Sequence, residues 1–327
     1  MNWKGKKVLV TGAGGFIGSH LSERLVELGA RTRAFVHYNA LGSWGWLDES
    51  SRRKEIEVMA GDICDRDSVR RAMNGVDVVF HLAALIAIPY SYEAPESYVR
   101  TNVLGTLNVL QAAREVGVER IIHTSTSEVY GTATYVPIDE KHPLRGQSPY
   151  SASKIGADKM AEAFHLSFGL PVVTVRPFNT FGPRQSARAI VPTIVTQCLK
   201  GLVVRLGNLR PSRDLTYVAN TVEGFVLAAE SKHVIGHTIN LGSGREIVIR
   251  DLVKMIAGIV GKSVSIQTEE KRVRPENSEV DRLLADNTLA RRLLRWKPAI
   301  SLETGLELTV EWMRSHQERY RSGVYTI

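Results

Sequence analysis

The sequence predicts an α/β protein in which a doubly wound parallel β-sheet is joined to a smaller lobe of mixed α/β structure. Short apolar runs alternate with helical patterns over the first half of the chain, and this repeated βα order is typical of a parallel sheet covered by helices on both faces. The regular order fades after Arg176, where the second lobe is expected to begin. The chain of 327 residues also exceeds the usual length of one domain, about 100–200 residues.

The strands and helices of the first lobe are predicted from the spacing of apolar residues. The expected strands are Lys7–Thr11, Arg33–Val36, Ile56–Met59, Asp77–Ala83, Arg120–Ser125 and Val172–Arg176. The expected helices are Gly15–Leu28, Ser68–Met73, Pro95–Val116 and Ser148–Phe168. Gly29, Gly117 and Gly169 follow three of these helices, where glycine commonly ends a helix because it adopts the left-handed conformation.

The second lobe is predicted to contain a helix near Ile190–Lys200, a short strand at Val203–Leu206 and mixed elements toward the end of the chain. The segments Thr216–Ser231 and Thr238–Leu241 are expected to return to the first lobe. The predicted domain boundaries are therefore discontinuous. Residues 1–177 plus about 214–241 would form the first domain, and residues 178–213 plus about 242–327 would form the second.

A glycine-rich segment at residues 11–18, Thr-Gly-x-x-Gly-x-x-Gly, follows the first predicted strand and opens the first predicted helix. Gly12 permits a tight turn, Gly15 lets a pyrophosphate approach the helix N-terminus, and Gly18 allows close helix packing. This context predicts that the first domain is a Rossmann-type dinucleotide-binding domain. The other residues expected to line the cofactor are Phe16, Ile17, His37, Asp62, Ile63, Leu82, Ala83, Ala84, Asn102, Thr124, Tyr150, Lys154 and Pro177.

The end of the second predicted strand bears on the choice of cofactor. Many NAD enzymes carry an acidic residue there that bonds the ribose 2′-hydroxyl, whereas this chain reads Ala-Phe-Val-His-Tyr-Asn over residues 34–39. The lack of a carboxylate removes repulsion against a 2′-phosphate, and Arg33, His37 or Arg52 could approach such a group. The predicted cofactor is therefore NAD(P), with a slight preference for NADP.

Two motifs carry groups suited to acid–base chemistry, Ser-Thr-Ser-Glu-Val-Tyr-Gly at residues 125–131 and Tyr-Ser-Ala-Ser-Lys at residues 150–154. Tyr150 and Lys154 share one face of a predicted helix, and the ammonium is expected to lower the phenol pKa from its usual value near ~10. A phenol tuned in this way can remove a hydroxyl proton. Glu128 is not needed for alcohol oxidation but suits removal of a proton from a carbon beside a new ketone. The combination predicts an oxidation followed by a second step.

Composition and charge argue against several other classes of function. The net charge of +8 comes from basic residues scattered through the chain without a nucleic-acid motif, so no nucleic-acid partner is expected. No apolar run approaches the ~20 residues that span a bilayer, and the apolar run near the start is too short for a signal peptide. These features predict a cytoplasmic protein without a membrane partner. Cys64 and Cys198 lie far apart without metal-ligand spacing, so neither a disulfide nor a metal is predicted.

The motifs together resemble those of the extended short-chain dehydrogenase/reductase superfamily, in particular its nucleotide-sugar epimerases and dehydratases. The resemblance spans essentially the whole chain. It rests on the glycine motif at 11–18, His-Leu-Ala-Ala at 81–84, Ser-Thr-Ser-Glu-Val-Tyr-Gly at 125–131, Tyr-x-x-x-Lys at 150–154, Arg-Pro-Phe-Asn-Thr-Phe-Gly-Pro-Arg at 176–184, Arg-Asp at 213–214 and Asn-Leu-Gly-Ser-Gly at 240–244. Two of these segments are similar to those of 4,6-dehydratases that act on UDP-N-acetylglucosamine on routes to legionaminic or pseudaminic acid.

The resemblance implies a 4,6-dehydratase reaction on a nucleotide sugar held by the second domain. Tyr150 would remove the O4 proton while hydride leaves C4 for the nicotinamide, Thr126 would help to hold that oxygen, and Lys154 would bind the nicotinamide ribose. Glu128 would then take the C5 proton, water would leave from C6, and the hydride would return to C6. The residues implied for the substrate diphosphate are Asn179, Arg184, Arg213 and Arg274.

Ser127 departs from the family pattern, because many 4,6-dehydratases carry an aspartate there as the acid that protonates the leaving C6 hydroxyl. A serine hydroxyl is too weak an acid for that role, so three interpretations stay open. Glu128 passes the C5 proton to the leaving hydroxyl, or the reaction is decarboxylation of UDP-glucuronate, or the substrate is a 5,6-ene sugar that needs only hydride at C6. A nucleotide-sugar 4-epimerase is a further alternative, since it also uses tyrosine and lysine.

The helices predicted over Pro95–Val116 and Ser148–Phe168 resemble the pair through which these enzymes form a four-helix dimer interface. A homodimer is therefore expected. The predicted partners are a nucleotide-sugar substrate and a second copy of the chain.

Overall fold

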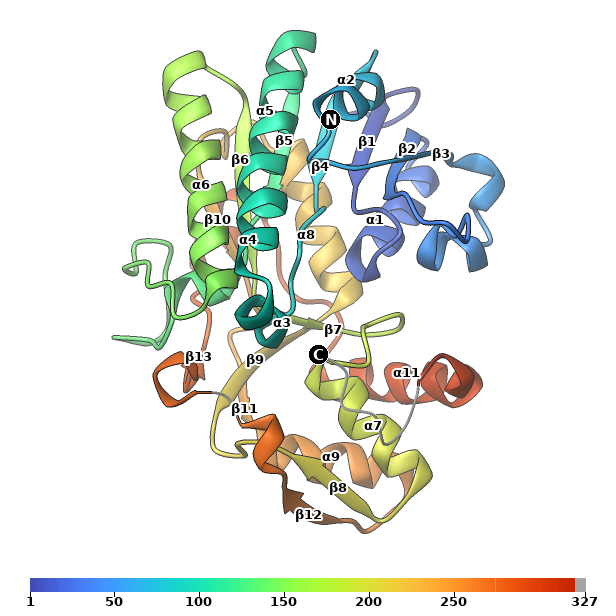
Figure 1. The fold of residues 1–327 in the computed structure, drawn as a ribbon, viewed down its shortest axis with the longest axis vertical. Coiled ribbons are helices and arrows are strands. Elements are labelled where there is room, and N and C mark those ends of the chain that lie inside the picture. Colours follow the sequence, from blue (N-terminus) through green and yellow to red (C-terminus); the bar gives the residue numbers. More distant parts are fainter. Residues whose placement is uncertain (274, 321–327) are drawn as a thin grey trace.

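The computed structural model describes residues 1–273 and 275–320. Its largest element is a seven-stranded sheet with strand order β10-β6-β5-β4-β1-β2-β3, in which neighbouring strands are parallel (Figure 1). The strands of this sheet are β1 (Lys7–Thr11), β2 (Arg31–His37), β3 (Glu57–Gly61), β4 (Val78–His81), β5 (Arg120–Thr124), β6 (Val172–Pro177) and β10 (Thr238–Leu241). The predicted Rossmann-type α/β fold is confirmed.

Helices cover both faces of the sheet. On one face lie α1 (Phe16–Glu27) and α8 (Val218–Glu230), and on the other lie α2 (Arg66–Met73), α5 (Gly105–Val116) and α6 (Pro149–Phe168). Strand residues alternate between these faces, so Val8 and Val10 of β1 join the core beneath α1 and α8, whereas Leu9 joins the core beneath α2 and α5. The sheet is therefore buried on both sides, which explains its continuous apolar runs.

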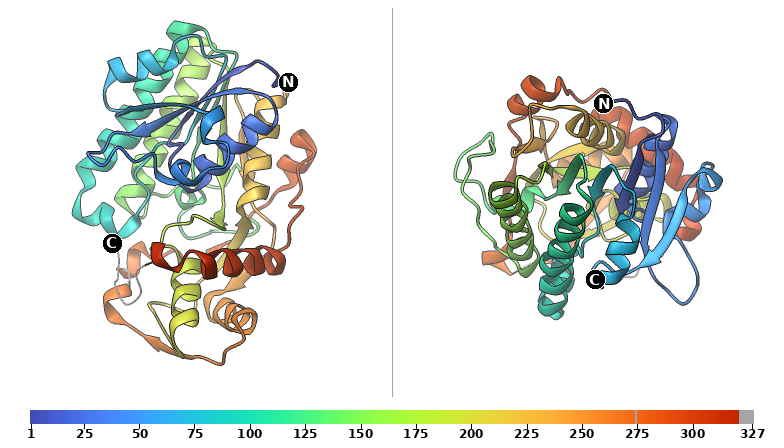
Figure 2. Two further views of the ribbon diagram at one scale, coloured as in Figure 1. Left: turned by 90° about the vertical axis from the view of Figure 1, so that its right-hand side faces the viewer. Right: turned by 90° about the horizontal axis from the view of Figure 1, so that it is seen from above.

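A smaller lobe lies beyond the carboxyl ends of the sheet strands, as Figures 1 and 2 show. Its strands β9, β11, β13 and β7 form one small sheet, and β8 pairs with β12. The elements after β6, other than α8 and β10, are β7 (Asn179–Phe181), α7 (Ile190–Lys200), β8 (Val203–Leu206), β9 (Ser212–Tyr217), β11 (Glu246–Val248), α9 (Ile249–Val260), β12 (Ser265–Thr268), β13 (Arg282–Leu283), α10 (Thr288–Leu294) and α11 (Leu302–Ser315). α10 packs on α8 and β10, so this late segment of the chain contacts elements of the first lobe.

Two details of the first lobe differ from the predicted elements. The helix expected over residues 95–116 consists of α4 (Pro95–Tyr98), the π-helical segment η3 (Val99–Leu104) and α5. An additional short helix, α3 (Ile88–Glu93), precedes them. Within the part of the chain that the structure describes, no helix is long and apolar enough to cross a membrane.

Candidate active site

The glycine-rich turn lies at the carboxyl end of β1, where the strand order changes direction between β1 and β4. Gly12 has a φ of +71°, and a Cβ there would lie 2.8 Å from the backbone nitrogen of Ala83. A Cβ at Gly18 would lie 2.2 Å from the carbonyl oxygen of Gly12. Both positions require glycine because a side chain would collide with backbone atoms.

α1 begins directly after this turn and offers an anion site. Gly15 is its N-cap residue, no side chain caps the helix, and the first turn, which starts with Phe16 and Ile17, contains no acidic residue. The N–H groups of a first helical turn lack partners within the helix, and they bind phosphate groups through hydrogen bonds and the helix dipole. The glycine-rich turn and the N-terminus of α1, together called the glycine cradle below, therefore fit the pyrophosphate of a dinucleotide.

Leu82, Ala83 and Ala84 follow β4 and lie beside the glycine turn. Thr11 fixes this segment, since its Oγ1 accepts a hydrogen bond from the Ala83 N–H at 3.1 Å and lies 2.8 Å from Nδ1 of His81. The ends of β1 and β4 are thus tied together at the switch point, where open parallel sheets bind their ligands.

Other predicted cofactor residues occupy different positions. His37 is exposed at the end of β2, and the Asp62 carboxylate accepts a hydrogen bond from the backbone two residues further on. The side chain of Ile63 is buried in the core between α2 and α5. The Asn102 amide donates to Ser153 Oγ at 2.9 Å, which ties η3 to α6. The side chains of Ile63 and Asn102 therefore contact protein groups that hold the core and α6 in place.

The arginines expected near a 2′-phosphate are already engaged. The Arg33 guanidinium donates to two backbone carbonyl oxygens at 2.8 and 2.9 Å and forms an ion pair with Glu57 at 3.0 Å. Arg52 pairs with Glu55 at 3.0 Å. Arg33 and Arg52 thus contact carboxylates of this chain, and His37, the third residue named for a 2′-phosphate, is exposed, so these contacts give the predicted preference for NADP no support.

α6 carries the Tyr-x-x-x-Lys pair. Ser148 caps this helix, which sets the first turn in which Tyr150 lies. Tyr150 is buried, and its ring centroid lies 6.2 Å from that of Tyr98 in an edge-on arrangement. Lys154, one turn later, is also buried, and its Nζ donates to the carbonyl oxygen of Thr124 at 2.6 Å. The helix thus places a phenol and an ammonium beside the end of β5.

The pKa of Tyr150 moves in the opposite direction to the one predicted. Burial has the largest effect and raises it, a hydrogen bond with Thr126 lowers it, and the nearby carboxylate of Glu128 raises it further. Burial also lowers the pKa of Lys154 to about 8, against an opposing effect of Asp158. The sequence spacing shows that the two side chains share a face, but burial decides the protonation state, and in this structure the phenol is neutral.

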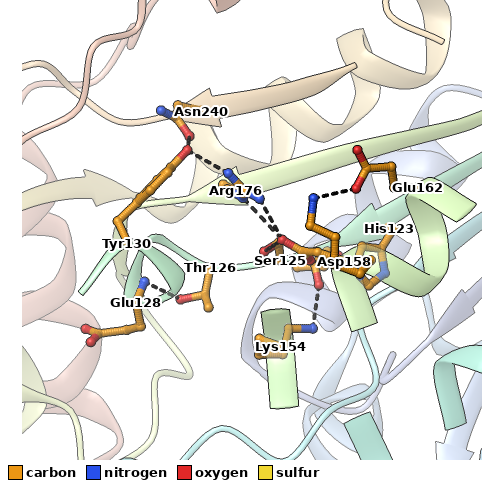
Figure 3. A network of polar contacts seen from close by, with 12 residues as sticks. His123, Ser125, Thr126, Glu128, Tyr130, Lys154, Asp158, Glu162, Arg176 and Asn240 are labelled. Carbon is orange, nitrogen blue, oxygen red and sulfur yellow. Dashed lines mark hydrogen bonds and ion pairs between the residues drawn. The ribbon is translucent and has the colours of Figure 1, made fainter. Parts of the chain in front are cut away.

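The turn η4 (Ser127–Tyr130) carries the predicted second-step residue. Its N-cap is Thr126, whose Oγ1 accepts a hydrogen bond from the Glu128 N–H at 3.2 Å. Ser127 is buried, whereas the Glu128 side chain is half-buried and points away from Lys154 (Figure 3). The Thr126 hydroxyl and the Glu128 carboxylate are therefore close enough to Tyr150 to affect the pKa of its phenol.

Figure 3 shows a buried polar network that the sequence did not predict, formed by Ser125, Tyr130, Asp158, Arg176 and Asn240. Oδ2 of Asp158 accepts hydrogen bonds from Ser125 Oγ at 2.7 Å and from Nη2 of Arg176 at 2.9 Å. Nη1 of Arg176 donates to the Tyr130 hydroxyl at 3.0 Å, and that hydroxyl donates to Oδ1 of Asn240 at 2.7 Å. The network joins α6, β6, η4 and β10.

Two signals in the sequence could have revealed this network. Asp158 follows Lys154 by four residues, the spacing that places two side chains on one helical face. Arg176 ends an otherwise apolar run that reads as a buried strand, and a charge in such a place requires a partner.

Some buried polar atoms of the described structure lack a hydrogen-bond partner that a bound ligand could supply. Thr124 Oγ1 and Asn179 Oδ1 are buried and have no hydrogen-bond partner within the described structure. Buried polar groups are nearly always hydrogen-bonded, so such atoms call for a water or a ligand. Thr124 stands at the end of β5 among the predicted cofactor residues, and Asn179 starts β7 just after Pro177, on the side of the predicted sugar site.

The arginines predicted for the substrate diphosphate have different surroundings. Arg213 is buried in β9 and forms an ion pair with Glu279 at 3.5 Å. Arg184 donates to both carboxylate oxygens of Glu23 on α1, at 2.9 and 3.0 Å. The structure thus gives Arg184 a role in joining the two lobes. Arg274 lies outside the described residues.

A parallel sheet with a glycine turn at its switch point, a Tyr-x-x-x-Lys helix and a second lobe over the strand ends define an extended short-chain dehydrogenase/reductase. A family model described as GDP-mannose 4,6 dehydratase matches residues 9–309. The chain therefore belongs to the nucleotide-sugar epimerases and dehydratases of that superfamily, as its motifs predicted. Residues 1–273 and 275–320 contain no cluster of His, Cys, Asp or Glu that could hold a metal ion.

Relatives include both dehydratases and epimerases. The chain is 35% identical to a dTDP-glucose 4,6-dehydratase of Streptomyces griseus over 316 residues, covering 95% of this chain and 94% of the relative. It is 32% identical to a UDP-glucose 4-epimerase of Mycolicibacterium smegmatis over 318 residues, covering 95% of this chain and 100% of the relative.

Solved structures show the same division. A double mutant of the dTDP-glucose 4,6-dehydratase DesIV of Streptomyces venezuelae, with NAD and DAU bound, is 30% identical with a TM-score of 0.86, covering 96% of this chain and 98% of its own. The UDP-glucuronic acid 4-epimerase of Bacillus cereus, with UDP-glucuronic acid and NAD bound, is 29% identical with a TM-score of 0.87, covering 95% of this chain and 99% of its own. Both of these neighbours bind NAD.

Proposed function

We propose that this protein is an NAD-dependent nucleotide-sugar 4,6-dehydratase that acts on UDP-N-acetylglucosamine or a related nucleotide amino sugar. One observation carries the proposal: the Glu128 carboxylate lies close enough to Tyr150 to raise the pKa of its phenol. The turn capped by Thr126 thus holds a carboxylate, suited to removing a carbon proton, near a phenol suited to removing a hydroxyl proton. The dehydratases among the relatives support the reaction, and the motif similarity supports the amino sugar.

The residues present fit NAD. The glycine cradle would hold the pyrophosphate, while Lys154 and the unpartnered hydroxyl of Thr124 would contact the nicotinamide end. When bound, NAD would accept the hydride from C4 of the sugar and return it to C6. His37 at the end of β2 is exposed and not acidic, so it would leave the ribose 2′-hydroxyl to solvent or backbone groups.

The first step assigned to the chain is removal of the O4 proton by Tyr150. Because burial raises the pKa of this phenol, it needs a neighbouring positive charge to act as a base. The Lys154 ammonium, one helical turn away, is the group suited to that task. Thr126, whose hydrogen bond lowers the phenol pKa, would help to hold the sugar O4 beside Tyr150.

The second step is loss of water across C5 and C6. The C4 ketone acidifies the C5 proton, and Glu128 removes it. Ser127 is buried in the same turn but cannot act as the acid, so Glu128 delivers that proton to the C6 hydroxyl, which leaves as water. The sugar thus loses one hydrogen from C5 and one hydroxyl from C6, which together make up the departing water.

A 4-epimerase is the second candidate. Relatives named as epimerases match the chain about as well as the dehydratases do, and Ser127 stands where many 4,6-dehydratases carry an aspartate as the acid.

To separate the candidates, the purified protein is incubated with NAD and nucleotide-linked N-acetylglucosamine, glucose, mannose or glucuronate, and the products are examined by mass. Loss of one water with the nucleotide retained is expected for the amino sugar. Unchanged mass with altered NMR couplings would indicate epimerisation, loss of carbon dioxide would indicate decarboxylation, and Tyr150→Phe is the inactive control. Turnover of a 5,6-ene sugar alone would indicate the remaining alternative.

A further inference from the structure

Lys154 lies in surroundings that oppose its positive charge. Its residue surface is only 4% exposed, and its Nζ donates to the Thr124 carbonyl oxygen at 2.6 Å. Burial removes water from the ammonium and lowers the pKa of Lys154 to about 8. A lysine with this pKa is divided between its charged and neutral forms at mildly alkaline pH, so a neighbouring charge decides which form prevails.

Asp158 is an acidic neighbour of this lysine. It lies one turn further along α6, so the two side chains share a helical face. Asp158 is 5% exposed. Burial raises its pKa, but the hydrogen bond from His123 and the positive charges of Arg176 and Lys154 lower it to about 2. The side chain is therefore a carboxylate over the whole working range of pH.

Consecutive residues of one strand end hold both side chains. His123 Nε2 donates to Asp158 Oδ1 at 2.9 Å, Thr124 accepts the Lys154 hydrogen bond at 2.6 Å, and Ser125 donates to Asp158 Oδ2 at 2.7 Å. The contacts with Asp158 thus flank the contact with Lys154. Because β5 is buried and paired on both sides, neither side chain can move away from the other without breaking these bonds.

The other titratable groups packed around the lysine supply no negative charge. His81 from β4 and His123 from β5 are neutral, because burial lowers the pKa of each imidazole. Tyr150 on α6 is neutral because burial raises its pKa. Arg176 from β6 is a cation that donates to Asp158 through Nε and Nη2. Asp158 is the group whose charge raises the pKa of the lysine.

We propose that Asp158 is a positioning residue of the active site, whose carboxylate holds Lys154 in its ammonium form. The catalytic consequence rests on the proposed function, in which that ammonium assists the Tyr150 phenol and binds the cofactor ribose. A neutral lysine would leave the buried phenol without the positive charge it needs. A different role for Asp158, neutralising Arg176 alone, makes the charge of Lys154 independent of Asp158, so titration separates the two.

The direct test is an NMR titration of protein labelled with [13C]lysine, in which the Lys154 signal is assigned by its loss in Lys154→Met. Because a neighbouring charge shifts a pKa by about 1–3 units, the Lys154 midpoint is expected to fall by about 1 pH unit or more in Asp158→Asn. The alkaline limb of the kcat/KM profile is expected to move to lower pH by a similar amount. A midpoint that stays unchanged in Asp158→Asn overturns the proposal.

Control variants separate charge from packing. Ser125→Ala removes one hydrogen bond to Asp158 but no charge, so the midpoint is expected to stay in place. Asp158→Glu keeps the charge and is expected to restore the midpoint. Because Asp158→Asn leaves Arg176 without its carboxylate, Asp158→Asn combined with Arg176→Met removes both charges and is expected to keep the midpoint low. If the double variant titrates like the unmodified protein, the proposal is wrong.

The titration needs neither substrate nor turnover, so its failure is distinct from failure of the proposed function. If the Lys154 midpoint falls in Asp158→Asn but the unmodified protein dehydrates no nucleotide sugar, the role of Asp158 stands and the proposed dehydratase function is wrong. An unchanged midpoint in an active dehydratase would reject the role of Asp158 alone.

Discussion

Among single residues, the proposed dehydration depends most directly on Glu128. In Glu128→Gln, the C4 oxidation is expected to proceed while loss of water slows by about 10²–10⁴-fold, the usual contribution of a general base. Absorbance of the reduced cofactor should then build up during a single turnover, and mass analysis should show little dehydrated product. Glu162→Gln, an exposed change on α6, is the matched control and should behave like the unmodified protein. Water loss at the normal rate in Glu128→Gln would remove the basis for the second step.

The residue scale also shows what sequence spacing can and cannot predict. The spacing of Tyr150 and Lys154 correctly places them one turn apart on a helix. The direction of the Tyr150 pKa could not be predicted, because it depends on burial by groups such as Tyr98 that are far away in the sequence. Arg184 matched a family motif, yet its guanidinium binds Glu23, a partner that only the folded chain brings near.

Among the structural elements, the turn η4 depends on its link to the neighbouring strands. The Tyr130 hydroxyl accepts from Arg176 at 3.0 Å and donates to Asn240 at 2.7 Å, and both contacts are buried. Tyr130→Phe leaves these partners unsatisfied, so the free energy of unfolding is expected to fall by about 1–3 kcal/mol in denaturant titrations. Tyr135→Phe removes a hydrogen bond of a side chain that is 44% exposed and should change stability by less than about 0.5 kcal/mol. Equal losses in the two variants would show that the network does not hold the turn.

The elements of the first lobe could be predicted well because its strands are continuous apolar runs and its long helices end at glycines. Gly117 and Gly169 indeed adopt left-handed conformations at the ends of α5 and α6. The π-helical segment η3 could not be predicted, since the apolar spacing that predicts a helix does not distinguish it from an α-helix. The short helix α3 has no long apolar period to reveal it.

At the scale of the whole molecule, we propose that two copies associate through α5 and α6, which lie side by side in Figure 1. Leu104, at the end of η3, is 41% exposed in the single chain, as an interface residue would be. Leu104→Glu is expected to convert a dimer into a monomer at micromolar concentration, because a carboxylate would have to be buried without a partner. Size exclusion with light scattering measures the mass, and Leu202→Glu in the smaller lobe should leave the dimer intact. A monomeric unmodified protein would contradict this assembly.

The arrangement of the lobes was harder to predict than the sheet. The return of α10 to α8 and β10 follows from packing between segments that are distant in the sequence. The ion pair of Arg184 with Glu23 and the hydrogen bond of the Tyr320 hydroxyl to the Gln185 carbonyl oxygen likewise join distant segments. The local patterns specify each element, whereas the contacts between lobes depend on the complete fold.

In the proposed reaction, hydride leaves C4 of a nucleotide sugar and returns to C6 within one active site. UDP-N-acetylglucosamine carrying deuterium at C4 tests it directly, with the product examined by NMR and mass spectrometry. A 4,6-dehydratase predicts a 4-keto-6-deoxy product that has lost one water and carries the deuterium at C6. Deuterium that remains at C4 in a product of unchanged mass would contradict the account and identify an epimerase.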